Sequence, residues 1–327
     1  MMKNSGKKET SMTATVSAFA RAWHREHSPR PVFDDPLAKA LLGEDFLQIA
    51  GQMAAGIGFF APDFSGTEEE ALTHIVNTQL GPLPLARAAF GEQALEQAAA
   101  CGAGQYLILG AGYDSFALRQ PEWARNMTVY ELDLPDTAAD KQERLRRAGL
   151  SVPDNVRYVQ ADLTAPDWTQ RLKQAGFASG VPTFCALPGV SYYLPYGALK
   201  ELLLDLGGLL PTKSLLALDY PTEDHGRLAR TQTALAAEAG EPMVPGYAPT
   251  ELEGLLEAGG FRLTRLLDET GIAETLFFRP RPCFAGAAHA PRSRRGPVSR
   301  GKDRGLRAGQ PCFTVSRVRL RHHLPWR

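Results

Sequence analysis

Cysteine is scarce in this sequence, and long apolar runs are missing. The 327 residues include 4 cysteines, whose positions match neither a disulfide framework nor a CxxC metal site. No run of about 18 apolar residues is present, which excludes an ordinary membrane-spanning helix. The basic start MMKNSGKKETSMTA is not followed by an apolar stretch, so it does not have the pattern of a secretory signal. We expect a cytoplasmic protein that does not associate with a membrane.

An excess of charge of one sign is also missing, since 36 Lys and Arg residues balance 36 Asp and Glu residues. A neutral chain argues against general attraction to nucleic acid. The charges are unevenly distributed, because residues 282–327 contain 11 basic residues and a single acidic one. This segment is dense in Arg, Gly, Pro and Ser and has no strand or helix period, so we predict a disordered basic tail. An arm that binds RNA or another polyanion is the functional alternative, and it is the one hint of a nucleic-acid partner.

Helical patterns fill the first hundred residues, apart from residues 1–10, which we expect to be disordered. The segment SMTATVSAFARAWH places apolar side chains at i, i+3, i+4 and i+7, which is typical of an amphipathic helix. These side chains are Val16, Phe19, Ala20 and Trp23. Further helical segments follow, and we predict a helical cap with lead-in helices over residues 11–100.

Short apolar segments alternate with helical ones from residue 106 onwards. The predicted strands are YLILG, MTVYELD, NVRYVQADL, PTFCALPGV, SLLALDY and AETLFFRP. Strands separated by helices of about 10–15 residues form parallel sheets through right-handed crossovers. Residues 101–281 are therefore predicted to form an α/β core with a doubly wound, mainly parallel sheet, followed by the tail at 282–327.

The first predicted strand ends in LGAGYD, where Gly110 and Gly112 permit a tight turn and the close approach of a ligand. A dinucleotide-binding GxGxxG pattern would have its third glycine where this chain has Ser115. Asp114 adds negative charge where a pyrophosphate would lie. The pattern disfavours a nicotinamide dehydrogenase and favours a nucleotide cofactor with a cationic end. A pair of turn glycines that binds nothing is the structural alternative.

Acidic residues end the next two predicted strands. Glu131 and Asp133 lie on one face of their strand, and Asp133 follows the first glycine turn by about 20 residues, which is typical of a carboxylate that binds ribose. Asp162 and Leu163 end the third strand, where the acid could accept from an adenine amino group and the leucine could lie on the ring. Each acid alone fits equally well with a solvated strand end or a helix cap. Three successive strand ends of this kind indicate a cofactor site.

With these segments in this order, the sequence resembles class I S-adenosylmethionine-dependent methyltransferases of the leucine carboxyl methyltransferase family, in the bacterial O-methyltransferase branch. The resemblance covers residues 11–280 and is strongest over 109–119 and 128–135. It implies a seven-stranded methyltransferase sheet with S-adenosyl-L-methionine as the cofactor. The residues that it implies for cofactor binding are Gly110, Gly112 and Asp114 at the methionine end, Asp133 with Glu131 at the ribose, Asp162 and Leu163 at the adenine, and Arg87 at the methionine carboxylate.

A bidentate pair between an arginine and a carboxylate makes physical sense for Arg87. A surface arginine on an amphipathic helix is the alternative, since exposed arginines are common.

The resemblance implies O-methylation of a carboxylate or a hydroxyl on a small-molecule acceptor. Some members of the branch, including those that methylate a protein C-terminus, have Glu where this chain has Pro188, so protein carboxyl methylation is the less favoured alternative. A non-catalytic cofactor-binding module is a third. Tyr193, after the fourth strand, is the candidate catalytic residue, and His24 and His27 on the cap are further candidates for a base. A pocket-wall tyrosine and solvated helix-end histidines are the structural alternatives.

Overall fold

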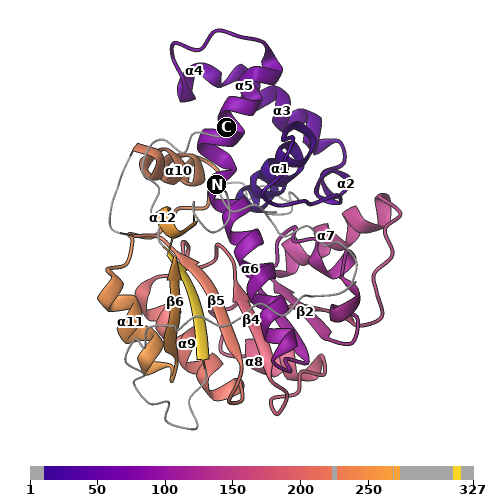
Figure 1. Ribbon diagram of the computed structural model, residues 1–327, viewed down its shortest axis with the longest axis vertical. Coiled ribbons are helices and arrows are strands. Elements are labelled where there is room, and N and C mark those ends of the chain that lie inside the picture. Colours follow the sequence, from indigo (N-terminus) through magenta and orange to yellow (C-terminus); the bar gives the residue numbers. More distant parts are fainter. Residues whose placement is uncertain (1–10, 223–226, 268, 273–311, 318–327) are drawn as a thin grey trace, which may run out of the picture.

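The computed structural model describes residues 11–222, 227–267, 269–272 and 312–317. Figure 1 shows a group of helices at one end of the molecule and a sheet flanked by helices at the other. Helix α6 (Pro82–Ala100) runs from the helical part along the sheet and joins the two. All described strands follow α6 in the chain.

The helical part, called the cap below, consists of the elements that precede α6. They are α1 (Met12–His27), α2 (Ala38–Leu42), α3 (Asp45–Ala55), α4 (Ile57–Phe60), α5 (Glu68–Ile75) and the π-helical turn η1 (Val76–Leu80). Ser11 caps α1 by accepting a hydrogen bond from the Ala14 N–H group at 3.1 Å. On the predicted apolar face of α1, Phe19, Ala20 and Trp23 are buried and Val16 is partly buried. Phe19 lies against the rings of Trp23 and Phe46. The cap therefore has a hydrophobic cluster of its own, built around α1.

The sheet has seven described strands, and every pairing between them is parallel. They are β1 (Gln105–Leu109), β2 (Thr128–Asp133), β3 (Val156–Gln160), β4 (Thr183–Leu187), β5 (Leu215–Tyr220), β6 (Arg262–Leu267) and β7 (Cys312–Arg317). Their order across the sheet is β3-β2-β1-β4-β5-β7-β6. The predicted doubly wound α/β fold is confirmed.

Helices cover both faces of the sheet, because the strands are apolar on both sides. Leu107 and Leu109 of β1 face one hydrophobic cluster, whereas Tyr106 and Ile108 face the other. The first cluster includes leucines of α8 (Trp168–Gln174), α9 (Tyr196–Leu209) and α11 (Pro249–Ala258), and the second includes the apolar side of α6. The remaining elements are α7 (Pro135–Arg147), α10 (Arg227–Glu238), α12 (Glu269–Ile272), η2 (Phe116–Leu118) and η3 (Glu122–Ala124).

The prediction of a disordered tail at 282–327 is wrong for Cys312–Arg317. These residues form β7, which lies inside the sheet between β5 and β6. The composition of the whole tail concealed a short segment, CFTVSR, that combines aromatic and β-branched residues and can complete two backbone ladders at once. The predicted closing strand AETLFFRP lies outside the described residues.

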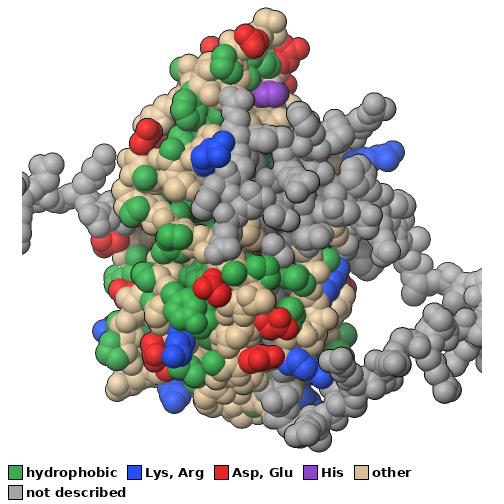
Figure 2. Space-filling model, turned by 90° about the vertical axis from the view of Figure 1, so that its left-hand side faces the viewer, with side chains coloured by type: hydrophobic (Ala, Val, Ile, Leu, Met, Phe, Trp, Pro, Cys, Tyr) green, Lys and Arg blue, Asp and Glu red, His purple; other side chains and the backbone are tan. Residues whose placement is uncertain are grey.

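Among the described helices, none is long and apolar enough to cross a membrane. Figure 2 shows one face of the molecule, on which acidic, basic and hydrophobic side chains are interspersed over the part that contains the sheet. No single sign of charge dominates this face.

Candidate active site at the carboxyl ends of the strands

The candidate site lies where the strand order reverses. The chain places β2 and β3 on one side of β1, and β4 and β5 on the other. Because the pairings are parallel, the loops that follow these strands emerge at one edge of the sheet. Ligands of doubly wound sheets bind at this switch point.

Two glycines shape the loop after β1. Gly110 and Gly112 have φ angles of 71° and 48°, in the left-handed region that favours glycine. The Gly110 N–H group donates to the Leu132 carbonyl at 2.8 Å, which ties the loop to the end of β2. A Cβ atom on Gly110 would lie 2.2 Å from the Cγ2 atom of Val190, so the loops after β1 and β4 are in contact and leave no room for a side chain.

Asp133 lies at the end of β2 and points into this loop. Its Oδ2 atom accepts from the Gly112 N–H group at 2.5 Å, and its Oδ1 atom accepts from the Leu134 N–H group at 2.7 Å. Burial raises the pKa of Asp133, and the two backbone donors act in the opposite direction. The structure thus brings Asp133 and the glycine loop together, as the sequence predicts.

Glu131, two residues earlier, is directed at a buried lysine. The Nζ atom of Lys141 on α7 lies 2.5 Å from the Glu131 Oε2 atom, and each side chain is 2% exposed. The Oε1 atom of Glu131 has no hydrogen-bond partner among the described residues. Burial raises the pKa of Glu131 to about 7, although Lys141 lowers it.

Lys141 was not predicted as part of the site. The signal that could have revealed it is its position on α7, three residues after Ala138 and four before Leu145, both of which are buried. A lysine in the apolar stripe of a helix needs a buried acid as partner.

Asp162 and Leu163 follow β3 at the same edge. The Ala161 N–H group donates to the Asp133 carbonyl at 2.9 Å, so the ends of β2 and β3 are tied together. The exposed Asp162 accepts through Oδ1 from the N–H and hydroxyl groups of Thr164, at 2.8 and 2.7 Å. One of its oxygens therefore serves the turn, which is the structural alternative for this acid, and Oδ2 is left for another donor.

Asp114 and Ser115 have different partners. The Asp114 Oδ1 atom accepts from the Phe116 N–H group at 2.8 Å within its own turn. Ser115, at the position of the missing third glycine, donates to the Oδ1 atom of buried Asp35 at 2.6 Å. Arg21 of α1 donates to Asp35 at 2.9 Å and also to the Tyr113 carbonyl at 2.7 Å. This buried network, which sequence reasoning missed, anchors the cap on the loop after β1.

The first turn of α1 lies directly on the same loop. A Cβ atom on Gly112 would lie 3.0 Å from the Cβ atom of Ala14. The Glu241 carboxylate accepts from the Met12 N–H group at 2.6 Å and from the hydroxyl groups of Ser11 and Thr13. The segment before α11 thus holds the N-terminus of α1 over the strand ends.

Tyr193 lies in the loop after β4, beside the contact between Glu241 and the N-terminus of α1. Burial raises the pKa of Tyr193, the neighbouring Glu241 carboxylate adds to the rise, and Thr13 opposes it. Its phenol therefore stays protonated at neutral pH. The hydrogen bond to Thr13 places Tyr193 beside the N-terminus of α1.

Arg87 of α6 reaches the same edge from the other side. Its Nε and Nη2 atoms donate to the Asp219 Oδ2 atom on β5 at 2.8 and 2.6 Å. Burial alone would lower the pKa of Arg87, but Asp219 and Tyr192 hold it above its usual value. The arginine side chain is 18% exposed, so Arg87 is not the surface residue of the structural alternative.

The two cap histidines have contacts within the cap. His24 accepts from the Val32 N–H group at 2.9 Å, and burial lowers its pKa to about 4. His27 stacks on Trp23 with ring centroids 3.7 Å apart. Both side chains serve the packing of the cap.

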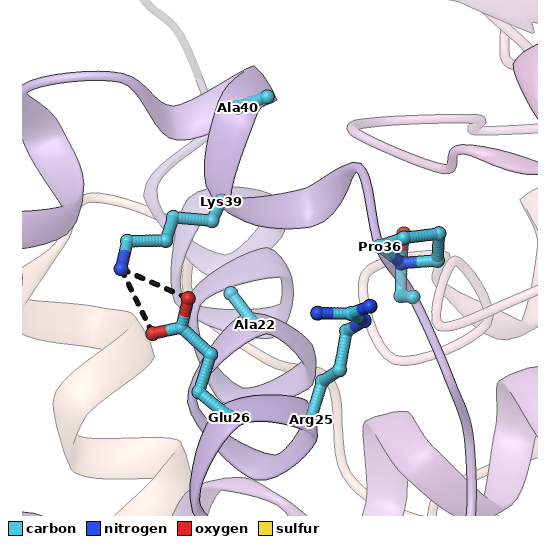
Figure 3. Close-up of a pocket in the computed structure, with 7 residues that line it drawn as sticks. Ala22, Arg25, Glu26, Pro36, Lys39 and Ala40 are labelled. Carbon is cyan, nitrogen blue, oxygen red and sulfur yellow. Dashed lines mark hydrogen bonds and ion pairs between the residues drawn. The ribbon is translucent and has the colours of Figure 1, made fainter.

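A depression of about 310 Å³ opens between α1 and α2 on the cap. Figure 3 shows the residues that line it, among which Lys39 forms an ion pair with Glu26. Arg25, at its rim, is paired with Asp34 at 2.7 Å. Both basic side chains that line the depression are thus paired with an acid.

Comparisons with known proteins identify relatives over most of the chain. The family model described as leucine carboxyl methyltransferase matches residues 14–206. A Bacillus subtilis protein provisionally named as an S-adenosyl-L-methionine-dependent methyltransferase is 36% identical over 282 residues, 83% of this chain and 92% of that protein. A Mycobacterium tuberculosis protein with a provisional name of the same kind is 31% identical over 234 residues, 70% of this chain and 74% of that protein. A solved structure of a DUF574 family protein from Streptomyces avermitilis has a TM-score of 0.48 at 17% identity, covering 76% of this chain and 84% of that one.

Proposed function

Because the chain belongs to the leucine carboxyl methyltransferase family and is an S-adenosyl-L-methionine-dependent methyltransferase, we propose that it transfers the methyl group to an oxygen atom of a small-molecule acceptor. The acceptor atom is a carboxylate or hydroxyl oxygen. When bound, the cofactor would supply an activated methyl group on a sulfonium, with S-adenosylhomocysteine as the leaving group when an acceptor oxygen takes the methyl carbon.

The strand-end residues fit this cofactor. Each oxygen of Asp133 accepts one backbone N–H group, and a carboxylate oxygen can accept two donors, so the carboxylate can also take both ribose hydroxyls. Gly110 and Gly112 give the loop after β1 its left-handed backbone conformation, and the methionine end would lie against this loop. Asp162 and Leu163 are assigned to the adenine, and Arg87 to the methionine carboxylate.

One observation carries the small-molecule assignment: the first turn of α1 lies on the loop after β1. The contact between Ala14 and Gly112, and the bonds from Glu241 to the start of α1, cover the loop that would hold the cofactor. An acceptor would therefore have to approach beneath α1, which favours a small molecule over a folded protein surface. Alignment of acceptor and methyl group in an enclosed site supplies most of the acceleration of such a transfer.

Tyr193 is proposed to orient the acceptor. Because its phenol stays protonated, it can donate a hydrogen bond to an acceptor oxygen but is a poor base at neutral pH. A carboxylate acceptor needs no base, whereas a hydroxyl acceptor would benefit from one. The protonated state of Tyr193 therefore fits a carboxylate better than an aliphatic hydroxyl.

Two alternatives share the fold. A methyltransferase acting on a protein C-terminus is disfavoured by Pro188, at the position where such family members have Glu. A non-catalytic module would retain the carboxylates at the strand ends and bind the cofactor without turnover.

The full-length protein is incubated with methyl-labelled S-adenosylmethionine and a cell lysate divided into a small-molecule fraction and a protein fraction. We expect label in the small-molecule fraction. Mild alkali then distinguishes the acceptors, because a methyl ester releases labelled methanol and a methyl ether does not. Asp133→Asn should lose the transfer, whereas Asp136→Asn, on an exposed acid in the first turn of α7, should retain it.

Label confined to the C-termini of proteins would overturn the small-molecule assignment. Unlabelled fractions, together with tight binding of S-adenosylhomocysteine, would identify a non-catalytic module.

A further inference from the structure

We propose that Asp219 is a positioning residue that fixes Arg87 and makes the subsite for the amino-acid end of the cofactor electrically neutral. This inference rests on the proposed assignment of Arg87 to the methionine carboxylate. It adds a second residue to that subsite and a basis for its selectivity, namely the preference for a ligand end that carries both a carboxylate and an ammonium group.

The Asp219 carboxylate is itself held from two elements. Its side chain is 1% exposed, its Oδ1 atom accepts from the Gly189 N–H group at 2.7 Å, and its Oδ2 atom accepts twice from Arg87. The Ser191 hydroxyl donates to the backbone carbonyl of Asp219. The end of β5 and the loop after β4 therefore define the position of the acid before any ligand arrives.

The guanidinium group of Arg87 is confined as tightly. Gly189 has a φ angle of 74°, and a Cβ atom there would lie 2.6 Å from Nη1 and 2.8 Å from Cζ of Arg87. The ring of Tyr192 has its centroid 5.7 Å from the same Cζ atom. Asp219 occupies the Nε–Nη2 edge, and Tyr192 forms a further hydrogen bond with the guanidinium. A second carboxylate would take the N–H donors on Nη1 and Nη2 that these two partners do not use.

This arrangement is adjacent to the predicted cofactor loop. Val190 follows Gly189 in the chain and contacts Gly110. A Cβ atom on Gly110 would lie 2.2 Å from the Cγ2 atom of Val190. One short loop thus connects the Arg87–Asp219 pair to the glycine turn after β1.

The charges explain what Asp219 contributes. A buried arginine alone would attract any anion, and it would be repelled by the ammonium group of an amino acid. Paired with Asp219, Arg87 presents directed donors without net charge. A zwitterionic amino-acid end can enter such a subsite without leaving a buried charge uncompensated, which is costly in a protein interior.

The test compares two ligands that share the adenosine part. S-adenosylhomocysteine carries the amino-acid end, and 5′-methylthioadenosine lacks it. Titration calorimetry on the full-length protein measures both affinities for wild type, Asp219→Asn and Arg87→Lys. Asp167→Asn is the matched control, because Asp167 pairs with Arg171 at 2.7 Å on the surface. We expect Asp219→Asn and Arg87→Lys each to weaken the affinity for S-adenosylhomocysteine by about tenfold or more. Their affinity for 5′-methylthioadenosine should change by less than about twofold. Asp167→Asn should leave both affinities unchanged.

A second variant tests the same inference if Asp219→Asn does not fold. Gly189→Ala keeps both charges but pushes a methyl group against the guanidinium, so it should show the same selective loss. Equal weakening of both ligands by Asp219→Asn would show a general structural role and overturn the inference. If Asp219→Asn binds S-adenosylhomocysteine as wild type does and Arg87→Lys binds it more weakly, the inference would also be overturned, but the proposed function would not. If neither Asp219→Asn nor Arg87→Lys changes the affinity for S-adenosylhomocysteine, Arg87 is not part of the site and the inference is overturned.

Discussion

The Glu131 carboxylate and the Lys141 ammonium group face one another at 2.5 Å inside the protein, where each side chain is 2% exposed. The pair joins β2, which ends in Asp133, to the helix that follows it. It also lies among acids, since Asp114 and Asp133 both raise the pKa of Glu131. Lys141 is therefore the cation that allows several carboxylates to be gathered beneath the candidate site.

Removal of Lys141 should strongly destabilise the protein. Lys141→Met leaves Glu131 buried without its partner, which typically costs about 3–5 kcal/mol. Urea unfolding at pH 7.5 measures the effect, with Arg147→Met as the control. Arg147 pairs with Glu143 on the exposed side of the same helix, and loss of such a pair costs about 0–1 kcal/mol.

The double variant Glu131→Gln with Lys141→Met separates the charge from the packing. It should recover much of the stability, because neither side chain then leaves an uncompensated charge. Equal losses for Lys141→Met and Arg147→Met would show that Glu131 does not depend on Lys141.

The sequence predicted what is local and periodic. Apolar runs alternate with amphipathic helices, so β1 to β5, their parallel pairing and the positions of Gly110, Asp133 and Asp162 at strand ends follow from the sequence, whereas β6 was not predicted. Parallel strands bring successive ends to one edge, which is why three separate short motifs converge.

The partnerships of the charged residues were beyond sequence reasoning. Arg87 and Asp219 are 132 positions apart, and Ser115 and Asp35 are 80 positions apart. Nothing in the local pattern of either residue specifies its partner, because long-range pairing depends on how the helices and the sheet pack. For the same reason β7 was missed, since its stability comes from two neighbouring strands and not from its own flanks.

Asp133 should dominate the affinity for the adenosine part of the cofactor. Asp133→Ala removes an acceptor of both ribose hydroxyls, and hydrogen bonds to a charged group are worth about 1.5–3 kcal/mol. Calorimetry with S-adenosylhomocysteine and with 5′-methylthioadenosine should show similar losses, because both ligands contain the ribose. Asp136→Ala, on an exposed acid three residues later, is the control and should bind as wild type does. An unchanged dissociation constant for Asp133→Ala would remove this residue from the site.

His24 should make the stability of the protein fall in mild acid. Burial lowers its pKa to about 4, below the unfolded value of about 6.5, so the unfolded chain binds a proton more readily than the folded one. The stabilisation that depends on neutral His24 is complete above pH 6.5 and is lost as the pH falls towards 4, by about 3 kcal/mol in total. Urea unfolding of wild type and His24→Gln at several pH values between 4 and 7.5 tests this.

His24→Gln should be less stable at pH 7.5 but should show a shallower fall with acid. His27→Gln, three positions along the same helix, is measured in the same way for comparison. Parallel pH profiles for wild type and His24→Gln would contradict the assignment.

We expect residues 312–317 of the tail to be required for the fold, in contrast to the expectation from the composition of the tail. A chain that ends at residue 281 lacks β7, which pairs with β5 on one side and β6 on the other. Its loss leaves the facing edges of two strands without partners in the interior of the sheet, and unpaired strand edges promote aggregation. We expect this truncation to be insoluble or to melt at a much lower temperature, whereas a chain that ends at residue 317 retains β7 and should melt as the full-length protein does. Soluble yield, melting temperature and affinity for S-adenosylhomocysteine are measured for the three chains. A soluble 1–281 chain with unchanged melting would show that β5 and β6 do not need β7, and it would restore the boundary of the core at residue 281.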